Sequence, residues 1–240
     1  MNKNRLIIAT LCSILWIAFP CAANAEIVVE ILNTDGYVFS KEERATIEEI
    51  AVAAEVEIRS LLPQLPKKIL LTVLSGKDVI PETGEMGTAV ALAYVRWTVD
   101  PSRPGGVMAL AKSNLRAALF HELNHLVRGW VVYGRSPDKS FMDGVVNEGL
   151  ATAFERDAAG TLPPWGMYPE EVKDWVDELL TLPLSASYEH WMFRHPDGRR
   201  WIGYRAGTYI IDKAMEASGL SASELVQSPT AKILELAGFK

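Results

Sequence analysis

The stretch SNLRAALFHELNHLVRG, residues 113–129, is the most informative part of this chain. Its leucines recur three or four residues apart, at Leu115, Leu119, Leu123 and Leu126. This spacing is typical of the apolar face of an α-helix, which we expect to end near Gly129. His121 and His125 are four residues apart, so they share one face of that helix and both imidazoles can bind a single metal ion.

Glu122 follows His121 directly and completes an H-E-x-x-H motif. On a helix this carboxylate lies beside the metal rather than on it. From there it can take a proton from a water molecule that the metal activates. The motif therefore predicts a metal-dependent hydrolytic site with Glu122 as its general base.

A third metal ligand has to come from elsewhere, because a catalytic zinc usually has three protein ligands and one open position. A metzincin would carry glycine and histidine where this chain has Arg128 and Val131, so that pattern fails. The remaining options are a histidine further on, either His190 or His195, and a carboxylate from a following helix.

Glu148 fits the carboxylate option. It lies 23 residues after His125, in the run NEGLA of residues 147–151. Residues 133–139 are expected to form the loop that lets the two helices pack against each other in opposite directions. Gly149, beside Glu148, is expected to let the two backbones come close to the metal.

The rest of the pattern predicts strands first and helices afterwards. Strands are expected at residues 27–32, 69–74 and 88–99, where β-branched and other apolar residues run together. Helices are expected at residues 41–62, 113–129, 141–158, 169–182 and 203–217, with short pieces after 221 and 228. Residues 76–87 and 183–200 are expected to be irregular. This order predicts an α+β fold, with a mixed N-terminal lobe and an all-helical C-terminal lobe, in one domain of residues 26–240.

The first 25 residues have the pattern of a signal peptide. Lys3 and Arg5 precede an apolar run at residues 6–19, and Ala23-Asn24-Ala25 is a cleavage site of the small-x-small type. Cleavage after Ala25 predicts a periplasmic or extracellular protein. The alternative is an uncleaved membrane anchor, for which the apolar run is short.

Cysteine content and charge narrow the chemistry further. The two cysteines, Cys12 and Cys21, both lie in the expected signal peptide, so a metal site in the mature chain must use His, Asp or Glu. Removing Lys3 and Arg5 takes the formal charge from −6 to −8. An acidic surface argues against nucleic acid or anionic lipid as a partner, and no stable membrane insertion is expected after cleavage.

The runs HELNH and NEGLA together resemble the gluzincins, the group of zinc peptidases that contains thermolysin and aminopeptidase N. The chain is more closely similar to a bacterial family of predicted zinc-dependent proteases. That resemblance covers residues 119–156, Pro164-Trp165 and residues 203–239, which is roughly the C-terminal half of the chain. It implies a zincin-like fold and hydrolysis of peptide or protein substrates.

The resemblance also implies roles for individual residues. It implies one zinc ion per chain, held by His121, His125 and Glu148. It places substrate backbone along the strand before the active-site helix, at Val90–Val95. Peptidases similar to aminopeptidase N use a tyrosine from a downstream helix to stabilise the oxyanion, and Tyr204 occupies a comparable position.

Two assignments stay open at this stage. Thermolysin-like enzymes have an aspartate four residues after the ligand glutamate, but this chain has Thr152 there, so Asp143 and Asn147 are the candidates for orienting a zinc-binding histidine. The oxyanion donor is expected to be Tyr204, with His190, His195 and Arg205 as the other candidates; a tyrosine that only packs under a helix start would look the same in the sequence.

Two other functions fit the same residues. One is a zinc-bound but inactive module that binds a partner at the bacterial surface; the presence of Glu122 argues against it, since binding alone needs no base. The other is a metal-dependent hydrolase that acts on a non-peptide amide such as one in the cell wall.

Overall fold

The computed structural model describes residues 26–34, 36–133, 140–183 and 185–239. The expected signal peptide and most of the loop expected at 133–139 lie outside the described residues. The first half of the chain contains β1 (Glu26–Leu32), α1 (Lys41–Leu61), β2 (Lys68–Ser75), β3 (Glu85–Ala91), β4 (Tyr94–Val99), α2 (Gly106–Leu110), the π-helical η1 (Ala111–Leu115) and α3 (Arg116–Arg128). The second half contains α4 (Phe141–Phe154), the π-helical η2 (Glu155–Ala159), α5 (Val172–Leu180), α6 (Tyr188–Met192), α7 (Ile202–Ser218), α8 (Ala222–Leu225) and α9 (Thr230–Leu236).

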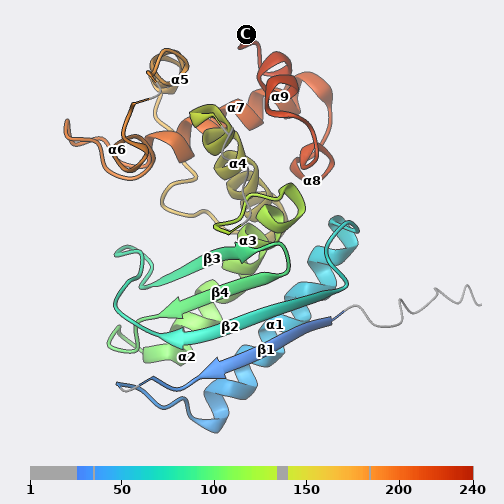
Figure 1. Ribbon diagram of the computed structural model, residues 1–240, viewed down its shortest axis with the longest axis vertical. Helices are drawn as coiled ribbons and strands as arrows, with labels where there is room; N and C mark the ends of the chain where they lie inside the picture. The colour runs from blue at the N-terminus through green and yellow to red at the C-terminus, as the bar shows by residue number, and fades with distance from the viewer. Residues whose placement is uncertain (1–25, 35, 134–139, 184, 240) are drawn as a thin grey trace, which may run out of the picture.

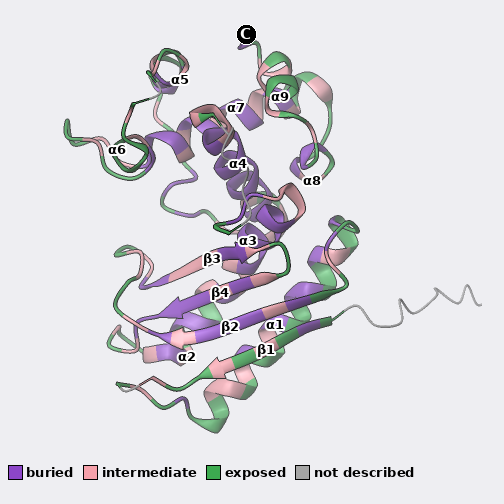
Figure 2. Cartoon of the chain, viewed as in Figure 1, coloured by how far each residue is buried: buried purple, intermediate pink, exposed green. Residues whose placement is uncertain are grey.

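The strands form one sheet in the order β1-β2-β4-β3. β2 pairs in parallel with β1 and with β4, whereas β3 is antiparallel to β4 and forms an edge of the sheet. Ile69, Leu71 and Val73 are buried, while Leu70 and Leu74, which alternate with them in direction, are only half-buried, as expected for a strand covered by helices on one face. Figure 2 shows β2 and β4 as mostly buried and β1 as largely exposed.

The single strand expected at residues 88–99 is a hairpin instead. β3 begins at Glu85, inside the stretch expected to be a loop, and the chain turns at residues 92–93 into β4. That prediction was wrong because the turn contains Leu92 and Ala93 rather than the glycine, asparagine or proline that usually mark a hairpin.

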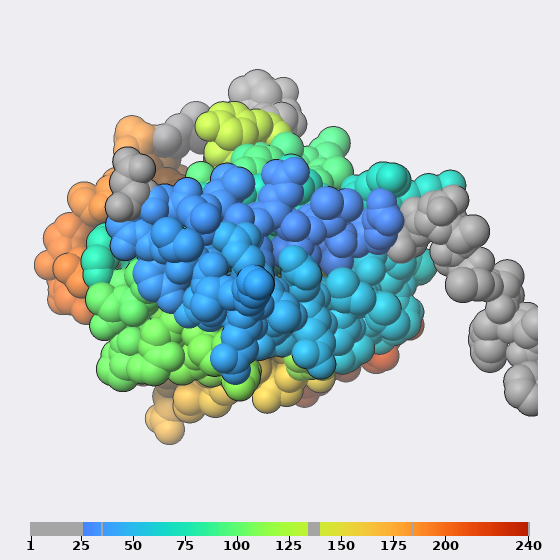
Figure 3. Space-filling view, turned by 90° about the horizontal axis from the view of Figure 1, so that it is seen from below, coloured from blue at the N-terminus to red at the C-terminus, as the bar shows by residue number. Residues whose placement is uncertain are grey.

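α1 confirms the predicted helix and its start. Ser40 and Glu43 form the expected capping box. Ile47, Ala51 and Ile58 are fully buried, which gives the helix one apolar face against the core. Figure 3 shows the opposite side of the molecule from the C-terminal helices, where residues of the N-terminal segment form the centre of the surface.

The helix that carries the H-E-x-x-H motif is longer than expected. Helical backbone starts at Gly106 and continues through α2, η1 and α3, rather than starting near residue 113. Gly105 precedes it with φ of 78°, a conformation that favours glycine, and Gly129 ends it with φ of 68°. The end was therefore predicted correctly and the start was not.

The C-terminal helices are built around the contact between α4 and α7 (Figure 1). A Cβ on Gly149 would lie 2.3 Å from the backbone of Gly207, and one on Gly207 would lie 2.2 Å from the carbonyl oxygen of Val145. Gly149 was expected to bring the backbone close to the metal-binding helix. Its close neighbour is α7 instead, so this glycine fixes how near α7 can approach α4.

Residues 183–200 are less irregular than expected. They contain α6 and a short antiparallel bridge between Arg194 and Arg200, after which Trp201 opens α7. Trp201 has φ of 59° and is the non-glycine residue with positive φ in the described chain. Such a backbone costs roughly 1 to 3 kcal/mol, so packing must hold it in place. Within the described residues, no helix is both long and apolar enough to span a membrane.

Candidate metal centre and cleft

α3 and α4 bring three potential metal ligands together. His121 and His125 come from α3 and Glu148 from α4, and all three are buried. Glu148 Oε2 lies 3.3 Å from His121 Nε2 and 3.2 Å from His125 Nε2. One ligand atom from each residue lies within 4.8 Å of the other two.

These separations fit a tetrahedral ion. Zinc binds histidine nitrogen and carboxylate oxygen at about 2.0–2.2 Å, so two ligand atoms at tetrahedral angles are about 3.3 Å apart. The two measured distances from Glu148 match this value. Both ring atoms that face Glu148 are Nε2; Nδ1 of His121 has a carboxylate partner, whereas Nδ1 of His125 is buried without a hydrogen-bond partner among the described residues.

The directions in which the pKa values of Glu148 and His121 are shifted indicate that the cluster favours a bound positive charge. Burial alone would raise the pKa of Glu148, but the charges and hydrogen bonds of His125 and His121 outweigh it and hold that pKa well below its usual range. Burial alone would lower the pKa of His121, yet its contacts with Glu148 and Glu155 raise it well above 6.5. A proton or a metal ion at this position would satisfy the same groups.

Glu155 is the residue that orients His121. Its Oε2 lies 3.2 Å from His121 Nδ1, and its Oε1 accepts a hydrogen bond of 3.2 Å from Thr161. The ligand Glu148 is oriented separately, because Trp130 Nε1 donates to its Oε1 at 3.0 Å. A carboxylate behind a ligand histidine fixes its tautomer and makes it a stronger ligand.

The sequence candidates for that orienting role were wrong. Asn147 accepts a hydrogen bond from Arg128, and Asp143 closes a capping box with Ser140 at the start of α4. Glu155 follows Glu148 by seven residues, which is two helical turns and the same helix face. The spacing could therefore have pointed to Glu155, but only Thr152, Asp143 and Asn147 were considered.

Glu122 lies between the imidazoles and the sheet. It is 8% exposed, and a Cβ on Gly87 of β3 would lie only 2.6 Å from its Oε1. Burial raises the pKa of Glu122, while His121 and His125 and a hydrogen bond from the Ala89 backbone partly oppose the rise. A raised pKa suits a carboxylate that has to accept a proton near neutral pH.

β3 presents free backbone groups beside this carboxylate. Glu85 O accepts from Ile80 N and Ala89 O from Val132 N, so the odd-numbered residues of β3 point their backbone groups away from β4. Gly87 lies between them, and nothing in the described chain pairs with it on that side. Val90–Val95, the expected substrate edge, is not one continuous strand, because those residues span the hairpin turn and Val90 O accepts a hydrogen bond from Tyr133 N.

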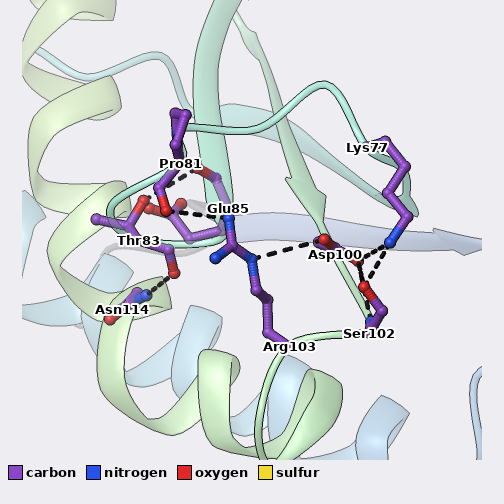
Figure 4. A network of polar contacts seen from close by, with 8 residues as sticks. All are labelled: Lys77, Pro81, Thr83, Glu85, Asp100, Ser102, Arg103 and Asn114. Atoms are coloured by element: carbon purple, nitrogen blue, oxygen red, sulfur yellow. Dashed lines mark hydrogen bonds and ion pairs between the residues drawn. The ribbon is translucent and has the colours of Figure 1, made fainter.

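The loop before β3 is held by a polar network (Figure 4). Arg103 donates to the carbonyl oxygen of Pro81 at 3.0 Å, and Asn114 donates to that of Thr83 at 3.2 Å. Asp100 binds Lys77 at 2.7 Å and also contacts Arg103. These contacts tie the loop to β4 and η1, so the edge strand has a defined position relative to α3.

A cleft of about 880 Å³ runs past these residues. β3 and its loop line one side, α3 and Glu148 the floor, and aromatic residues of the C-terminal half the other side, namely Trp165, Phe193, Trp201 and Tyr204. The ring of Tyr204 stacks on His121 with centroids 6.4 Å apart. Burial and the charge of Glu148 raise the pKa of Tyr204 well above 10, so its hydroxyl stays protonated and can donate.

The other residues considered from sequence lie away from this cluster. His190 is exposed on α6, and His195 pairs with Asp197 at 2.8 Å and stacks on Trp191. Arg205 donates to the carbonyl oxygen of Pro164 at 3.3 Å. Neither histidine belongs to the group that could hold a metal ion among the described residues.

The four-stranded mixed sheet and the helices that follow it are compatible with the predicted α+β class, and the chain carries a His-His-Glu group able to hold a metal ion. A family model described as Predicted Zn-dependent protease (DUF2268) matches residues 40–235, so the chain belongs to that family. The match confirms the resemblance to predicted zinc-dependent proteases and extends it to α1, well before the C-terminal half from which it was inferred. No curated protein and no solved structure matches the chain.

Proposed function

We propose that this protein is a zinc-dependent peptidase with a zincin-like arrangement. The observation that carries the proposal is the position of Glu122, which lies beside the His121, His125 and Glu148 cluster and faces the edge strand of an open cleft. A binding site for structural zinc needs no such carboxylate. A structural site also usually has four protein ligands, whereas three leave a position open for reactants.

In this proposal His121, His125 and Glu148 hold one zinc ion per chain, with Glu155 orienting His121 and Trp130 orienting Glu148. The ion supplies Lewis acidity, which polarises the scissile carbonyl and lowers the pKa of water to about 7. Glu122 accepts the proton of the attacking water and later delivers it to the leaving amine.

Tyr204 is the proposed oxyanion donor. Its ring stacks on that of His121, its hydroxyl is protonated next to Glu148, and it lines the same cleft as β3. A donor in that position can stabilise the negative oxygen of the tetrahedral intermediate.

Substrate backbone is proposed to lie along β3. The free N–H and C=O of Gly87 can pair with an extended peptide, as a strand added to a sheet edge does. This supports a peptide over a compact amide as substrate, because the groups left free next to the base are the N–H and C=O of an edge strand.

The proposed setting is the periplasm or the exterior of a bacterial cell. It is supported by the signal-peptide pattern of residues 1–25. The negative charge of the mature chain disfavours nucleic acid and anionic lipid as partners, which is consistent with a peptide or protein partner.

Zinc analysis and peptide cleavage of the mature chain test the proposal together. We expect about one zinc per chain, cleavage of peptide pools by the wild type, and loss of cleavage with retained zinc in Glu122→Gln. Zinc without cleavage of any pool would favour the binding module, and cleavage of cell-wall fragments alone would favour the non-peptide hydrolase. Absence of zinc after purification in zinc-containing buffer would overturn the metal site itself.

A further inference from the structure

Two arginines face each other at one end of the cleft. Arg194 and Arg200 are partners in an antiparallel bridge and both line the cleft that contains His121 and Glu122. The bridge is bounded by hydrogen bonds from His195 N to Arg199 O and from Trp201 N to Phe193 O. Arg194 and Arg200 are therefore a non-hydrogen-bonded pair, the kind whose side chains lie closest together on one face.

Like charges directly opposite each other destabilise a strand pair. Acidic neighbours offset only part of this charge. Glu82 binds Arg200 Nη1 at 2.5 Å, and Glu189 also lines the cleft but forms no ion pair with either arginine in the described chain. Arg200 Nε is buried with no hydrogen-bond acceptor among the described residues, and Arg194 is exposed without an acidic partner there.

The bridge is held rigidly enough to keep the two guanidinium groups in place. Arg199, between them in the chain, binds Glu178 at 2.7 Å and lies over the rings of Trp175 and Trp191. This contact ties the turn to α5 and α6. The strained backbone of Trp201 shows that the geometry at this point is set by packing rather than by local preference.

Aromatic contacts connect the bridge to the proposed catalytic residues. Phe193 and Trp201, which flank the arginines, lie 5.9 Å and 5.5 Å from the ring of Tyr204 between centroids. Tyr204 in turn stacks on His121. Arg194 and Arg200 line the same cleft as Gly87 and Glu122, so a peptide bound along β3 would share that cleft with both guanidinium groups.

Resting on the proposed peptidase function, we propose that Arg194 and Arg200 form a subsite for a carboxylate of the substrate. A carboxylate between them would accept from both guanidinium groups, offset their mutual repulsion and use the free Nε of Arg200. Arginine binds carboxylates in two-pronged geometry, and such charged hydrogen bonds are stronger than neutral ones. The carboxylate belongs either to an acidic side chain or to the C-terminus of the peptide, and the same chemistry recognises both.

Binding of synthetic peptide pools tests the subsite without turnover. The zinc-loaded mature chain carrying Glu122→Gln is titrated with eight-residue pools in which one position at a time is fixed as Glu, Gln or Lys. Each pool is made with a free and with an amidated C-terminus. The same titrations are repeated with Arg194→Gln and Arg194→Glu added, and with Lys67→Gln as control. The Lys67 side chain is exposed and forms no ion pair within the described chain. Lys67→Gln therefore removes one positive charge, as Arg194→Gln does, but away from the cleft.

Charged hydrogen bonds of this kind correspond to a preference of about tenfold or more. We expect Glu pools to bind that much more tightly than Gln pools at one position, or free termini more tightly than amidated ones. The first result identifies an acidic side chain and the second a C-terminus. In either case Arg194→Gln should reduce the preference to within twofold, Arg194→Glu should favour Lys, and Lys67→Gln should keep the wild-type preference.

Arg200→Lys provides an independent variant, since it keeps the charge near Glu82 but removes the two-pronged donor. It should weaken the preference without changing the melting temperature. Equal binding of Glu and Gln pools with both kinds of terminus would overturn the subsite even if the wild type cleaves those pools. Selective binding of acidic pools, together with failure of the wild-type chain to cleave any pool, would overturn the peptidase proposal and keep the subsite. Failure of every pool to bind would overturn both.

Discussion

Alanine at residue 87 would test the geometry around the proposed base. A Cβ there would lie 2.6 Å from Glu122 Oε1 and 2.7 Å from Glu122 Cγ. Carbon atoms that are not bonded prefer about 3.5 to 4.0 Å. The Glu122 side chain, or β3 itself, therefore has to move by about 1 Å in Gly87→Ala.

This movement should affect activity far more than stability. The clashing atoms belong to a flexible side chain, so rotation of Glu122 relieves most of the overlap, and we expect a change in unfolding free energy within about 1 kcal/mol. A reacting group misplaced by about 1 Å costs on the order of 100-fold in rate. Zinc content should not change, because Glu122 is not among the three ligands.

The assay is steady-state cleavage of a peptide substrate by zinc-loaded Gly87→Ala, with zinc content and melting temperature measured on the same sample. Gly36→Ala is the matched control, since a Cβ at Gly36 meets nothing within 4 Å. We expect kcat to fall about 100-fold in Gly87→Ala and to stay unchanged in Gly36→Ala. If Gly87→Ala cleaves within threefold of wild type, Glu122 does not act from the position seen here.

Three further predictions follow from individual contacts. Glu155→Gln should weaken zinc affinity about 10- to 100-fold, measured by competition with a chelator, because His121 loses its carboxylate partner; unchanged affinity would contradict the orienting role. Tyr204→Phe should lower kcat about 100- to 1000-fold with little change in substrate binding, and turnover within threefold of wild type would leave Tyr204 structural. Burial raises the pKa of Glu85 to about 7, so the folded chain keeps a proton that the unfolded chain loses above about pH 4.5. The free energy of unfolding should therefore fall, by at most roughly 3 kcal/mol, as the pH rises through this window. Glu85→Gln should abolish that slope in urea unfolding at pH 5 and pH 8, and a slope that persists in Glu85→Gln would assign it to another group.

The helices could be predicted from the sequence because the patterns that mark them involve residues close together in the chain. The capping boxes at Ser40, Ser140 and Ser221 all form, and each needs only residues three apart in the chain. Likewise, the i, i+4 spacing of His121 and His125 puts both on one face of any helix. The position of Glu148 beside the two histidines could also be predicted, because a buried helix that follows a connecting loop packs against the helix before it.

The edge strand β3 could not be predicted from local patterns of this kind, and the orienting residue Glu155 was not predicted. β3 is recognisable as an edge only from its pairing with β4, and its turn lacks the usual residues. Gly87 carries no sign in the sequence of its contact with Glu122, because that contact joins a strand and a helix 35 positions apart. The bridge between Arg194 and Arg200 could not be predicted either, because it accompanies an unusual backbone conformation at Trp201.

The charges of the residues on the cleft floor favour a divalent cation. The buried carboxyl groups, and not the H-E-x-x-H motif alone, are the reason. Four carboxyl groups are buried there, those of Glu85, Glu122, Glu148 and Glu155, and no lysine or arginine pairs with them among the described residues. Buried carboxylates are costly unless they are paired or bind a metal, and the pKa values of Glu85 and Glu122 rise accordingly. Histidines bind a metal ion in their neutral form, so as ligands His121 and His125 would bring no charge to offset these carboxylates. A dication held by His121 and its neighbours would lower the cost for every carboxylate nearby, so chelation should lower the melting temperature as well as stop cleavage.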